Sequence, residues 1–211
     1  MTTVAVIYHS ATGTTKQLAD AISEGINSAG NIAIESSEYR IVGEDIIEGR
    51  FINRELLTAA GQADGIIFGS PTYMGGVSAQ FKAFADATGE LWSKRQWANK
   101  IAAGFTIGSN YSGDQLSTIQ YLNTFANQHG MLWASIDVPG GFEAGILNRL
   151  GAQSGLIAQT RDGNVDADDL TMARYLGARV ARLAAGNSHS HTGDMVASRQ
   201  ALLVRRKPAS F

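Results

Sequence analysis

The stretch VAVIYHSATGTT, residues 4–15, decides the fold. Its first part, residues 4–8, is a short apolar run with β-branched side chains, which predicts a buried strand. Its second part, residues 10–15, is a loop of hydroxyls and one glycine, after which Leu18 and Ile22 recur at helical spacing. A buried strand that passes through such a loop into a helix begins a βαβ unit, so we expect an α/β domain.

The alternation of strand and helix continues along the chain, which is typical of a parallel sheet with helices on both faces. One irregular polar segment predicts an edge strand, and three apolar segments predict further strands: residues 32–42, 65–69, 101–106 and 132–138. Helical spacing predicts four more helices, the first of them capped by Asn53: residues 53–60, 77–85, 116–126 and 166–184. Residues 140–163 are glycine-rich and lack strong periodicity, so we expect a long connection there.

The length and composition of the chain fit one domain with one sizeable core. The chain has 211 residues, of which 44% are hydrophobic and 17% are charged. We expect the domain to span residues 1–186 and a flexible tail, residues 187–211, to follow it, with a polar linker first and a short helix at 197–206. His189 and His191 lie in that linker, where two histidines are more often solvated than bound to metal, so no metal site is predicted.

The charge pattern argues against a nucleic-acid partner. The formal net charge is -2, and the basic excess is confined to the tail, which holds Arg199, Arg205, Arg206 and Lys207. A mildly acidic body offers no basic stripe to a phosphate backbone. No apolar run approaches the roughly 20 residues of a membrane span, and neither a cysteine nor a secretory signal pattern occurs. We therefore expect a cytoplasmic protein without a membrane span.

Ligands of open parallel sheets bind beyond the carboxyl ends of the strands, where the strand order reverses. The loop after the first predicted strand consists of Ser10, Ala11, Thr12, Gly13, Thr14 and Thr15. Its backbone N–H groups, its hydroxyls and the positive end of the next helix dipole would bind a phosphate. The loop has neither the Gly-Lys-Ser/Thr ending of an ATP site nor the Gly-x-Gly-x-x-Gly of a Rossmann dinucleotide site. The alternative is a hydroxyl-rich helix cap without a ligand.

The loops after the third and fourth predicted strands combine glycines, hydroxyls and aromatic side chains. The first of these two loops includes Pro71, Thr72, Tyr73, Met74 and Gly75. The second includes Thr106, Ile107, Gly108, Ser109, Asn110, Tyr111 and Ser112. Tyr73 can stack on a flat ring, while permissive glycines let backbone N–H groups approach the edge of that ring. Either loop alone is equally compatible with an ordinary surface turn, whereas three such loops at one edge favour a ligand site.

With these loops the chain resembles the flavodoxin superfamily and, within it, the WrbA-type NAD(P)H:quinone oxidoreductases. The resemblance covers most of residues 3–186. It rests on a series of motifs: Ser10-x-Thr-Gly-x-Thr15, Gly69-Ser-Pro-Thr-Tyr-Met-Gly75, Ser78-x-Gln-x-Lys-x-Phe-x-Asp86, Thr88-Gly-x-Leu-Trp92, His129-Gly-Met131 and Ala173-Arg-Tyr-x-Gly177. Each motif is short, and their combination in this order is specific.

The resemblance implies a flavodoxin-like, doubly wound five-stranded parallel sheet in the order 2-1-3-4-5, with FMN as the cofactor. The first loop would surround the FMN phosphate, and the other two loops would surround the isoalloxazine. The resemblance also implies that His129 faces the flavin as a cofactor-binding and catalytic residue, and that Trp92 of a neighbouring subunit walls the substrate pocket. On spacing alone, His129 would be a capping residue at a helix end and Trp92 a packing residue.

The function that the resemblance implies is an FMN-dependent oxidoreductase that transfers two electrons from NAD(P)H to a quinone or a similar acceptor. Donor and acceptor would bind in turn, and the cofactor would carry the chemistry. The alternative is a flavodoxin-like electron carrier without its own dehydrogenase activity. A carrier gains docking rate from a strongly single-signed surface, whereas the body that precedes the basic tail is only mildly acidic, which favours the enzyme. We expect a homodimer or a homotetramer.

Overall fold

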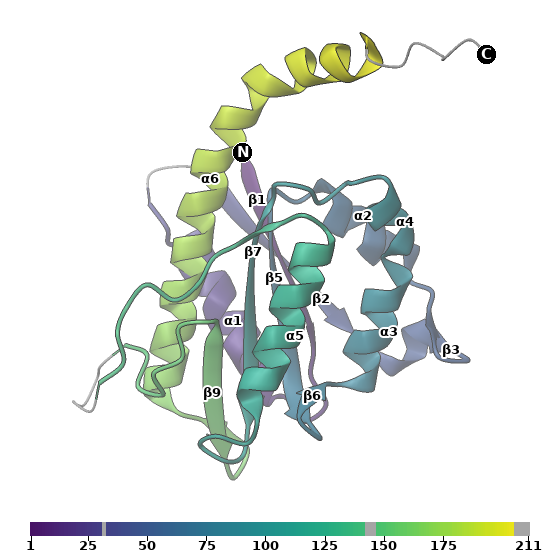
Figure 1. Cartoon of the computed structure of the whole chain (residues 1–211). Coiled ribbons are helices and arrows are strands. Elements are labelled where there is room, and N and C mark those ends of the chain that lie inside the picture. The colour runs from purple at the N-terminus through teal and green to yellow at the C-terminus, as the bar shows by residue number, and fades with distance from the viewer. Residues whose placement is uncertain (31–32, 142–146, 205–211) are drawn as a thin grey trace.

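A mostly parallel sheet forms the middle layer of the molecule, and helices cover both of its faces (Figure 1). The computed structural model describes residues 1–30, 33–141 and 147–204, with side chains as far as residue 187. The parallel strands lie in the order β2 (Ile34–Ile41), β1 (Thr2–His9), β5 (Gly65–Tyr73), β7 (Ile101–Gly108) and β9 (Leu156–Arg161). Numbered along the chain, this is the predicted order 2-1-3-4-5, which confirms the doubly wound α/β fold.

Short elements complete the sheet and the connection after β2. β6 (Gly76–Val77) folds back antiparallel on β5, and β10 (Asn164–Val165) does the same on β9. A separate hairpin of β3 (Ile46–Ile47) and β4 (Arg50–Phe51) follows the 3-10 turn Gly43–Asp45. This hairpin leads the chain from the edge strand into the next helix.

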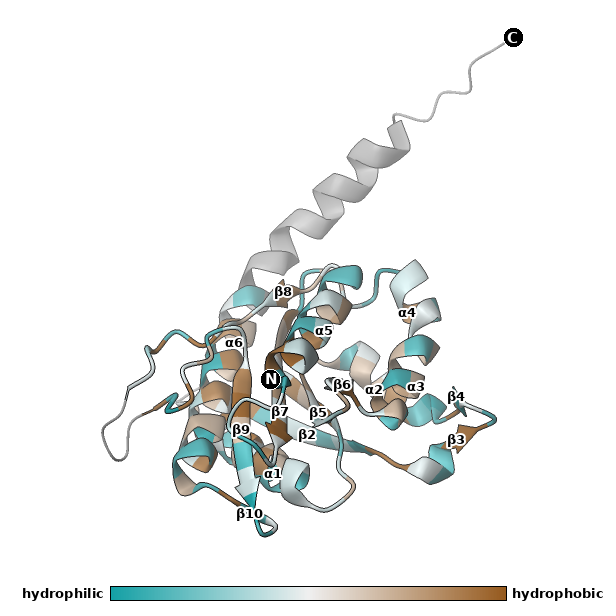
Figure 2. Ribbon diagram, turned by 60° about the horizontal axis from the view of Figure 1, so that its bottom comes forward, coloured by the Kyte–Doolittle hydropathy of each residue, from teal (hydrophilic) through white to brown (hydrophobic). Residues whose placement is uncertain are grey.

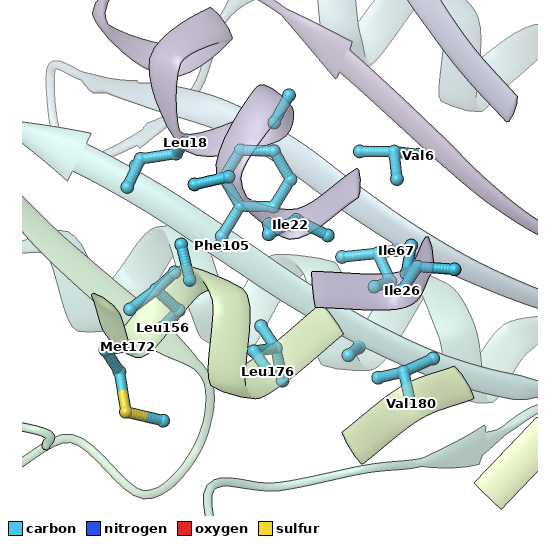
Figure 3. Close-up of a cluster of buried hydrophobic side chains, with 14 of the residues drawn as sticks. Val6, Leu18, Ile22, Ile26, Ile67, Phe105, Leu156, Met172, Leu176 and Val180 are labelled. Carbon is cyan, nitrogen blue, oxygen red and sulfur yellow. The ribbon is translucent and has the colours of Figure 1, made fainter. Parts of the chain in front are cut away.

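Helices α1 (Thr14–Asn27) and α6 (Ala167–Val204) cover one face of the sheet, where their apolar side chains join those of the strands in one cluster (Figure 3). The two helices approach closely because Gly25 and Gly177 stand at their contact. A Cβ atom at either glycine would collide with a backbone carbonyl of the opposite helix. Most of the apolar positions at helical spacing in these two helices are fully buried, among them Leu18, Ile22, Ile26, Ala173 and Val180, whereas Leu170 and, just beyond α1, Ala29 are partly buried.

Helices α2 (Arg54–Gln62), α3 (Ala79–Ala87) and α5 (Gln115–Gln128) cover the other face (Figure 1). The core there is an aromatic cluster whose rings meet mostly edge to face: Phe68, Phe81, Phe84, Trp97 and Phe125. The predicted cap of α2 is present, since the Asn53 side-chain oxygen accepts a hydrogen bond from the Leu56 amide at 2.9 Å.

The inward face of α5 differs from the apolar stripe that its sequence predicts. Leu116, which we expected to face the core, is 49% exposed, while Gln115 and Thr118 are fully buried together with Ile119. Hydrophobic spacing alone included Leu116 in the stripe. The observed rotation of the helix instead turns two polar side chains toward the carboxyl ends of the strands.

The fifth strand of the sheet is split into two pieces that both pair with β7. β8 (Leu132–Trp133) lies beside the amino-terminal half of β7, and β9 lies beside its carboxyl-terminal half, both parallel to it. The strand predicted at residues 132–138 is therefore wrong beyond Trp133. The connection predicted at residues 140–163 is also wrong in part, because it contains β9.

Alternate side chains after Trp133 stay buried although β8 ends there, which explains why the sequence predicts too long a strand. Ala134 and Ile136 remain buried in the core, so their alternation resembles that of a strand. The Ala134 amide still donates to the Ala102 carbonyl of β7 at 2.7 Å, but the backbone then turns away from β7, and the Ile136 amide donates to the Gln153 carbonyl at 2.8 Å. The connection between β8 and β9 contacts α6 through Arg149, which donates two hydrogen bonds to the carboxylate of buried Asp169, at 2.7 and 2.8 Å.

The last helix is longer than the sequence predicts. Since α6 continues to Val204, residues 187–193 are helical and do not form the expected linker, and the helix predicted at 197–206 is its continuation. Residues 205–206 lie outside the described residues. No proline occurs between the start of α6 and Val204, so each added residue gains a further backbone hydrogen bond. The domain boundary at residue 186 stays a prediction. None of the helices in the described ranges is both long and apolar enough to cross a membrane.

Candidate functional site

The three predicted loops lie together at one edge of the sheet. They follow β1, β5 and β7, which are parallel neighbours, so the ends of these strands meet. Figure 2 turns this edge, near β6 and β10, toward the viewer. A Cβ atom at Gly75 would lie 3.9 Å from the Asp114 Cβ atom, so the second loop reaches the residue that precedes α5. The structure therefore assembles the loops as the sequence predicts.

The first loop is shaped around one serine hydroxyl. Ser10 Oγ accepts hydrogen bonds from the amides of Gly13 and Lys16, at 3.2 Å each. Gly13 has a φ of +94°, a conformation that L side chains rarely adopt. In the described part of the chain, the amides of Thr14 and Thr15 have no hydrogen-bond acceptor. Two such amides at the positive end of a helix dipole form an anion site.

The threonines of this loop differ in burial. Thr14 and Thr15 are buried, whereas Ala11 and Thr12 are exposed. Thr12 Oγ1 lies 3.4 Å from Thr14 Oγ1, so the two hydroxyls form a weak contact across the loop. Thr12 presents its side chain at the surface, while the other two hydroxyls lie inside the loop.

A positive charge that sequence reasoning missed lies beside the same loop. Arg40 of β2 donates a hydrogen bond from Nη2 to the Ser10 carbonyl oxygen at 2.7 Å. Burial, and after it the charge of Arg40, lowers the pKa of His9. Arg40 pairs in register with Tyr8, which lies two residues before the loop. The position of Arg40 beside the loop therefore follows from the strand register and not from a sequence motif. This arginine both supports the loop and adds positive charge to its surroundings.

The second loop is a tight hairpin with large side chains at its tip. Tyr73 pairs with Gly76, and between them Met74 and Gly75 have φ values of +48° and +75°. Such a two-residue turn favours asparagine or glycine at its first position, so methionine there is strained. Met74 is fully exposed and Tyr73 is 46% exposed, while Pro71 is buried in β5 below them. Exposed apolar side chains on a strained turn make this hairpin a candidate contact surface.

The third loop is held from below by a buried glutamine that sequence reasoning missed. Gln115 Nε2 donates to the Asn110 carbonyl at 2.9 Å, while its Oε1 atom is buried without a partner among the described residues. Gly108 makes room for this amide, since a Cβ atom there would lie 3.2 Å from it. Tyr111 is 70% exposed. The remaining predicted residues are exposed at Ser109 and Ser112 and buried within β7 at Thr106 and Ile107.

Three threonine hydroxyls meet beneath the second and third loops. Thr72 Oγ1 lies 2.8 Å from Thr106 Oγ1 and 2.8 Å from Thr118 Oγ1. Thr106 and Thr118 are fully buried, and Thr72 is partly exposed. Thr118 belongs to α5 and to none of the predicted loops, so loop motifs gave no signal for it. We refer to Thr72, Thr106 and Thr118 as the hydroxyl trio.

His129 and Trp92 lie away from the loops of their own chain. α5 begins at the third loop and has 14 residues, so its far end, where His129 is the C-cap, lies about 21 Å from its start. His129 and Trp92, which belongs to α4 (Gly89–Ser93), line a hollow of about 380 Å³. Within one chain the structure does not bring these two residues to the other predicted site residues.

His129 is buried and held in one tautomer by its neighbours. Its Nε2 atom lies 2.9 Å from Thr88 Oγ1, and this hydroxyl donates to the Ala85 carbonyl at 2.7 Å, so Nε2–H is the donor to Thr88. Nδ1 is then a buried acceptor without a partner in the described ranges. Burial lowers the pKa of His129 to about 4. These contacts agree with a packed capping histidine, whereas Trp92, at 54% exposed, is not a core residue.

A larger hollow, of about 800 Å³, lies between the β3–β4 hairpin, α2 and the segment of α3 and α4. Its lining, as far as the structure describes it, includes none of the predicted site residues. It is therefore separate from the loops at the carboxyl edge.

The fold and the three loops define a class of protein: an α/β protein with a candidate ligand site at the carboxyl ends of its parallel strands. Residues 2–139 match the sequence profile of the NADPH-dependent FMN reductase family. The chain belongs to this family.

Relatives with known names share most of the chain. Flavodoxin FldP of Pseudomonas aeruginosa is 37% identical over 191 residues, which cover 87% of this chain and 97% of that protein. An NAD(P)H dehydrogenase (quinone) of Archaeoglobus fulgidus is 35% identical over 196 residues, covering 87% and 98% of the two chains. The crystal structure of a flavodoxin, WrbA-like protein from Agrobacterium tumefaciens superposes with a TM-score of 0.68 at 36% identity, over 89% of this chain and 99% of that one.

These findings confirm the resemblance to WrbA-type proteins of the flavodoxin superfamily, and they indicate FMN as the cofactor. The residues present fit this cofactor. The free amides of Thr14 and Thr15 suit its terminal phosphate, and the exposed side chains of Tyr73, Met74 and Tyr111 suit its ring. The assignment of individual residues to parts of FMN remains a prediction.

Proposed function

We propose that the protein transfers two electrons from NAD(P)H to a quinone or a similar acceptor by way of FMN. Relatives in Archaeoglobus fulgidus and Sinorhizobium fredii, 35% and 31% identical, bear the name NAD(P)H dehydrogenase (quinone). The observation that carries the proposal is one exposed surface for ring binding, made by Tyr73, Met74 and Tyr111 on the loops next to the anion site. These side chains suffice to hold one flavin ring, whose one exposed face then has to receive donor and acceptor in turn.

The residues of this chain have binding and positioning roles in the proposal. The amides of Thr14 and Thr15 hold the phosphate, while Ser10 and Arg40 keep the first loop in shape. FMN, when bound, supplies the ring that accepts a hydride and passes electrons on. Because one surface serves both substrates, the nicotinamide leaves before the acceptor binds to it.

The proposal extends to a homodimer or homotetramer in which Trp92 and His129 of one chain wall the ring pocket of a neighbour. The separation of these two residues from the loops of their own chain supports this arrangement, since a second chain is needed to bring them there. Trp92 is 54% exposed beside a hollow, which leaves its ring available to a neighbour. The predicted contact of His129 with the acceptor then requires its ring to leave Thr88, because Nε2–H is donated to the Thr88 hydroxyl and Nδ1 carries no proton for a quinone oxygen.

Steady-state turnover of NADH or NADPH with a benzoquinone tests the single pocket. We expect parallel lines in double-reciprocal plots, because the first product must leave before the acceptor can bind. Intersecting lines would mean that donor and acceptor bind together, and the single-pocket proposal would fail. Sedimentation of the same preparation tests the shared pocket, since a monomer with full activity would remove the neighbour's Trp92 from the site.

A second function, that of an electron carrier, is favoured by one observation: the relative that is 37% identical bears the name flavodoxin. Anaerobic mixing of the holoprotein with each nucleotide separates the two functions. Bleaching of the flavin colour by NADH or NADPH supports the enzyme. If neither nucleotide reduces the flavin, the carrier takes its place.

A further inference from the structure

The hydroxyl trio is a buried polar cluster directly below two loops of the candidate site. Its members come from β5, β7 and α5, so three separate elements converge there. Both O···O distances are 2.8 Å, which is optimal for hydrogen bonds between hydroxyls. Thr72 takes part in both contacts, while Thr106 and Thr118 take part in one each. Both hydrogen bonds therefore share the Thr72 oxygen.

Counting protons gives the direction of the two hydrogen bonds. Each hydroxyl has one proton and two lone pairs. In the described part of the chain, the hydroxyls of Thr106 and Thr118 have no partner other than Thr72, and both side chains are fully buried. If Thr72 donated to either, the proton of that residue would be buried without an acceptor, which is costly. The favourable arrangement has both buried hydroxyls donating to Thr72.

The nearest polar group of the same helix does not change this count. Gln115 lies three residues before Thr118 and is buried with it on the inward face of α5. Its Oε1 atom has no hydrogen-bond partner among the described residues, so it does not take the Thr118 proton. Thr72 is thus left as the acceptor of both hydrogen bonds.

This arrangement makes Thr72 different from an ordinary surface threonine. Both of its lone pairs are occupied, so it can no longer accept a hydrogen bond from a ligand. Its own proton is the one proton of the trio that remains unused. Thr72 is also the member with exposed surface, and it directly precedes Tyr73 in the second loop. The trio therefore presents a single donor at the candidate ring site.

We propose that Thr106 and Thr118 make Thr72 a donor-only contact for the isoalloxazine ring of FMN, whose carbonyl oxygens and ring nitrogens accept hydrogen bonds. Thr118 is then a positioning residue that acts through Thr72. This inference rests on FMN as the cofactor and deepens the proposed function by adding a specificity-determining contact to its site. Nothing in it depends on which substrate reduces or oxidises the flavin.

A double-mutant cycle for FMN binding tests the proposal. The dissociation constant of FMN is measured by titration of apoprotein for the wild type, Thr72→Val, Thr118→Val and the double variant. Loss of one neutral hydrogen bond corresponds to a weakening of about 3- to 10-fold, which we expect for Thr72→Val. Thr118→Val should weaken binding about 2- to 5-fold in the wild type and leave it unchanged in the Thr72→Val background, because Thr118 acts through Thr72.

Conservative variants and a remote control separate this role from packing. Thr118→Ser keeps the hydroxyl and should retain the affinity and visible spectrum of the wild-type complex. Thr171→Val makes the same substitution on α6, where the hydroxyl bonds to its own helix at the Ala167 carbonyl, and it should also leave FMN binding unchanged. Equal weakening by Thr118→Ser and Thr118→Val, or additive effects in the cycle, would assign Thr118 to packing and overturn the proposal.

Two further outcomes keep the test decisive. If Thr118→Val does not fold, Thr72→Val decides alone, because Thr72 is partly exposed: FMN affinity equal to that of the wild type would show that Thr72 donates nothing. If the wild-type apoprotein takes up no FMN, the proposed function fails together with this inference. If the wild type binds FMN and the variants match it, this inference alone fails.

Discussion

At the scale of single residues, polar side chains outside the predicted loops give the candidate site its shape. Gln115 and Thr118 occupy inward positions of α5, and Arg40 reaches the first loop from a neighbouring strand. Sequence reasoning found the exposed loop residues, because hydroxyls and glycines after a strand have a known chemistry. It missed these three residues, because a polar side chain in a helix or an edge strand gives no signal until register and rotation are known.

The stability of the protein should depend on pH through His129. Burial lowers the pKa of His129 from the ordinary value of 6.5 to about 4, so the unfolded chain binds a proton at a higher pH than the folded chain does. The stability that neutral His129 contributes is therefore fully present above about pH 6.5 and is lost as the pH falls toward 4. In thermal melts, the Tm should fall as the pH is lowered from about 6.5 to about 4.

The variant His129→Gln isolates this effect from that of other groups, among them His9, whose pKa is lowered as well. Gln keeps an N–H donor for Thr88 and does not titrate in this range. Its Tm should fall less steeply than that of the wild type over the same pH window. Identical slopes for the two proteins would show that the burial of His129 does not cause the pH dependence.

At the scale of elements, the strands that pair along their whole length were predictable and the divided strand was not. β1, β5 and β7 are central, and their apolar runs predict them directly. The fifth position is shared by β8 and β9, and the buried side chains between them mimic a continuing strand. Burial leaves a pattern in the sequence, but the point at which a chain leaves the hydrogen-bond ladder does not.

The contact between α1 and α6 yields a matched pair of predictions in one helix. A Cβ atom at Gly177 would collide with the Ile22 carbonyl, whereas one at Gly186 meets no described atom within 4 Å. Gly177→Ala should therefore lower the free energy of unfolding by about 1–3 kcal/mol through overpacking. Gly186→Ala should leave it unchanged or raise it by about 0.5–1 kcal/mol, because alanine favours the helix. Urea unfolding of both variants measures this, and equal effects would contradict the close approach of the helices.

At the scale of the whole molecule, the sequence predicts the fold and the position of the site well. It predicts less well which residues come together in that site. The parallel order of the strands brings three loops to one edge, and the family and the structural relatives agree with that architecture. His129 and Trp92 show the limit of the prediction. Their motifs identify both residues, but in the single chain they lie away from the loops, and only the proposed assembly would bring them there.

The central claim is that the first loop is built for the terminal phosphate of FMN. Equilibrium titration of the apoprotein with FMN and with riboflavin, which has the same ring without the phosphate, tests it most directly. The free amides of Thr14 and Thr15 would each donate to a charged acceptor, and such hydrogen bonds are worth about 1.5–3 kcal/mol. The account predicts that riboflavin binds at least about 100-fold more weakly than FMN. Equal affinity for the two flavins would contradict it.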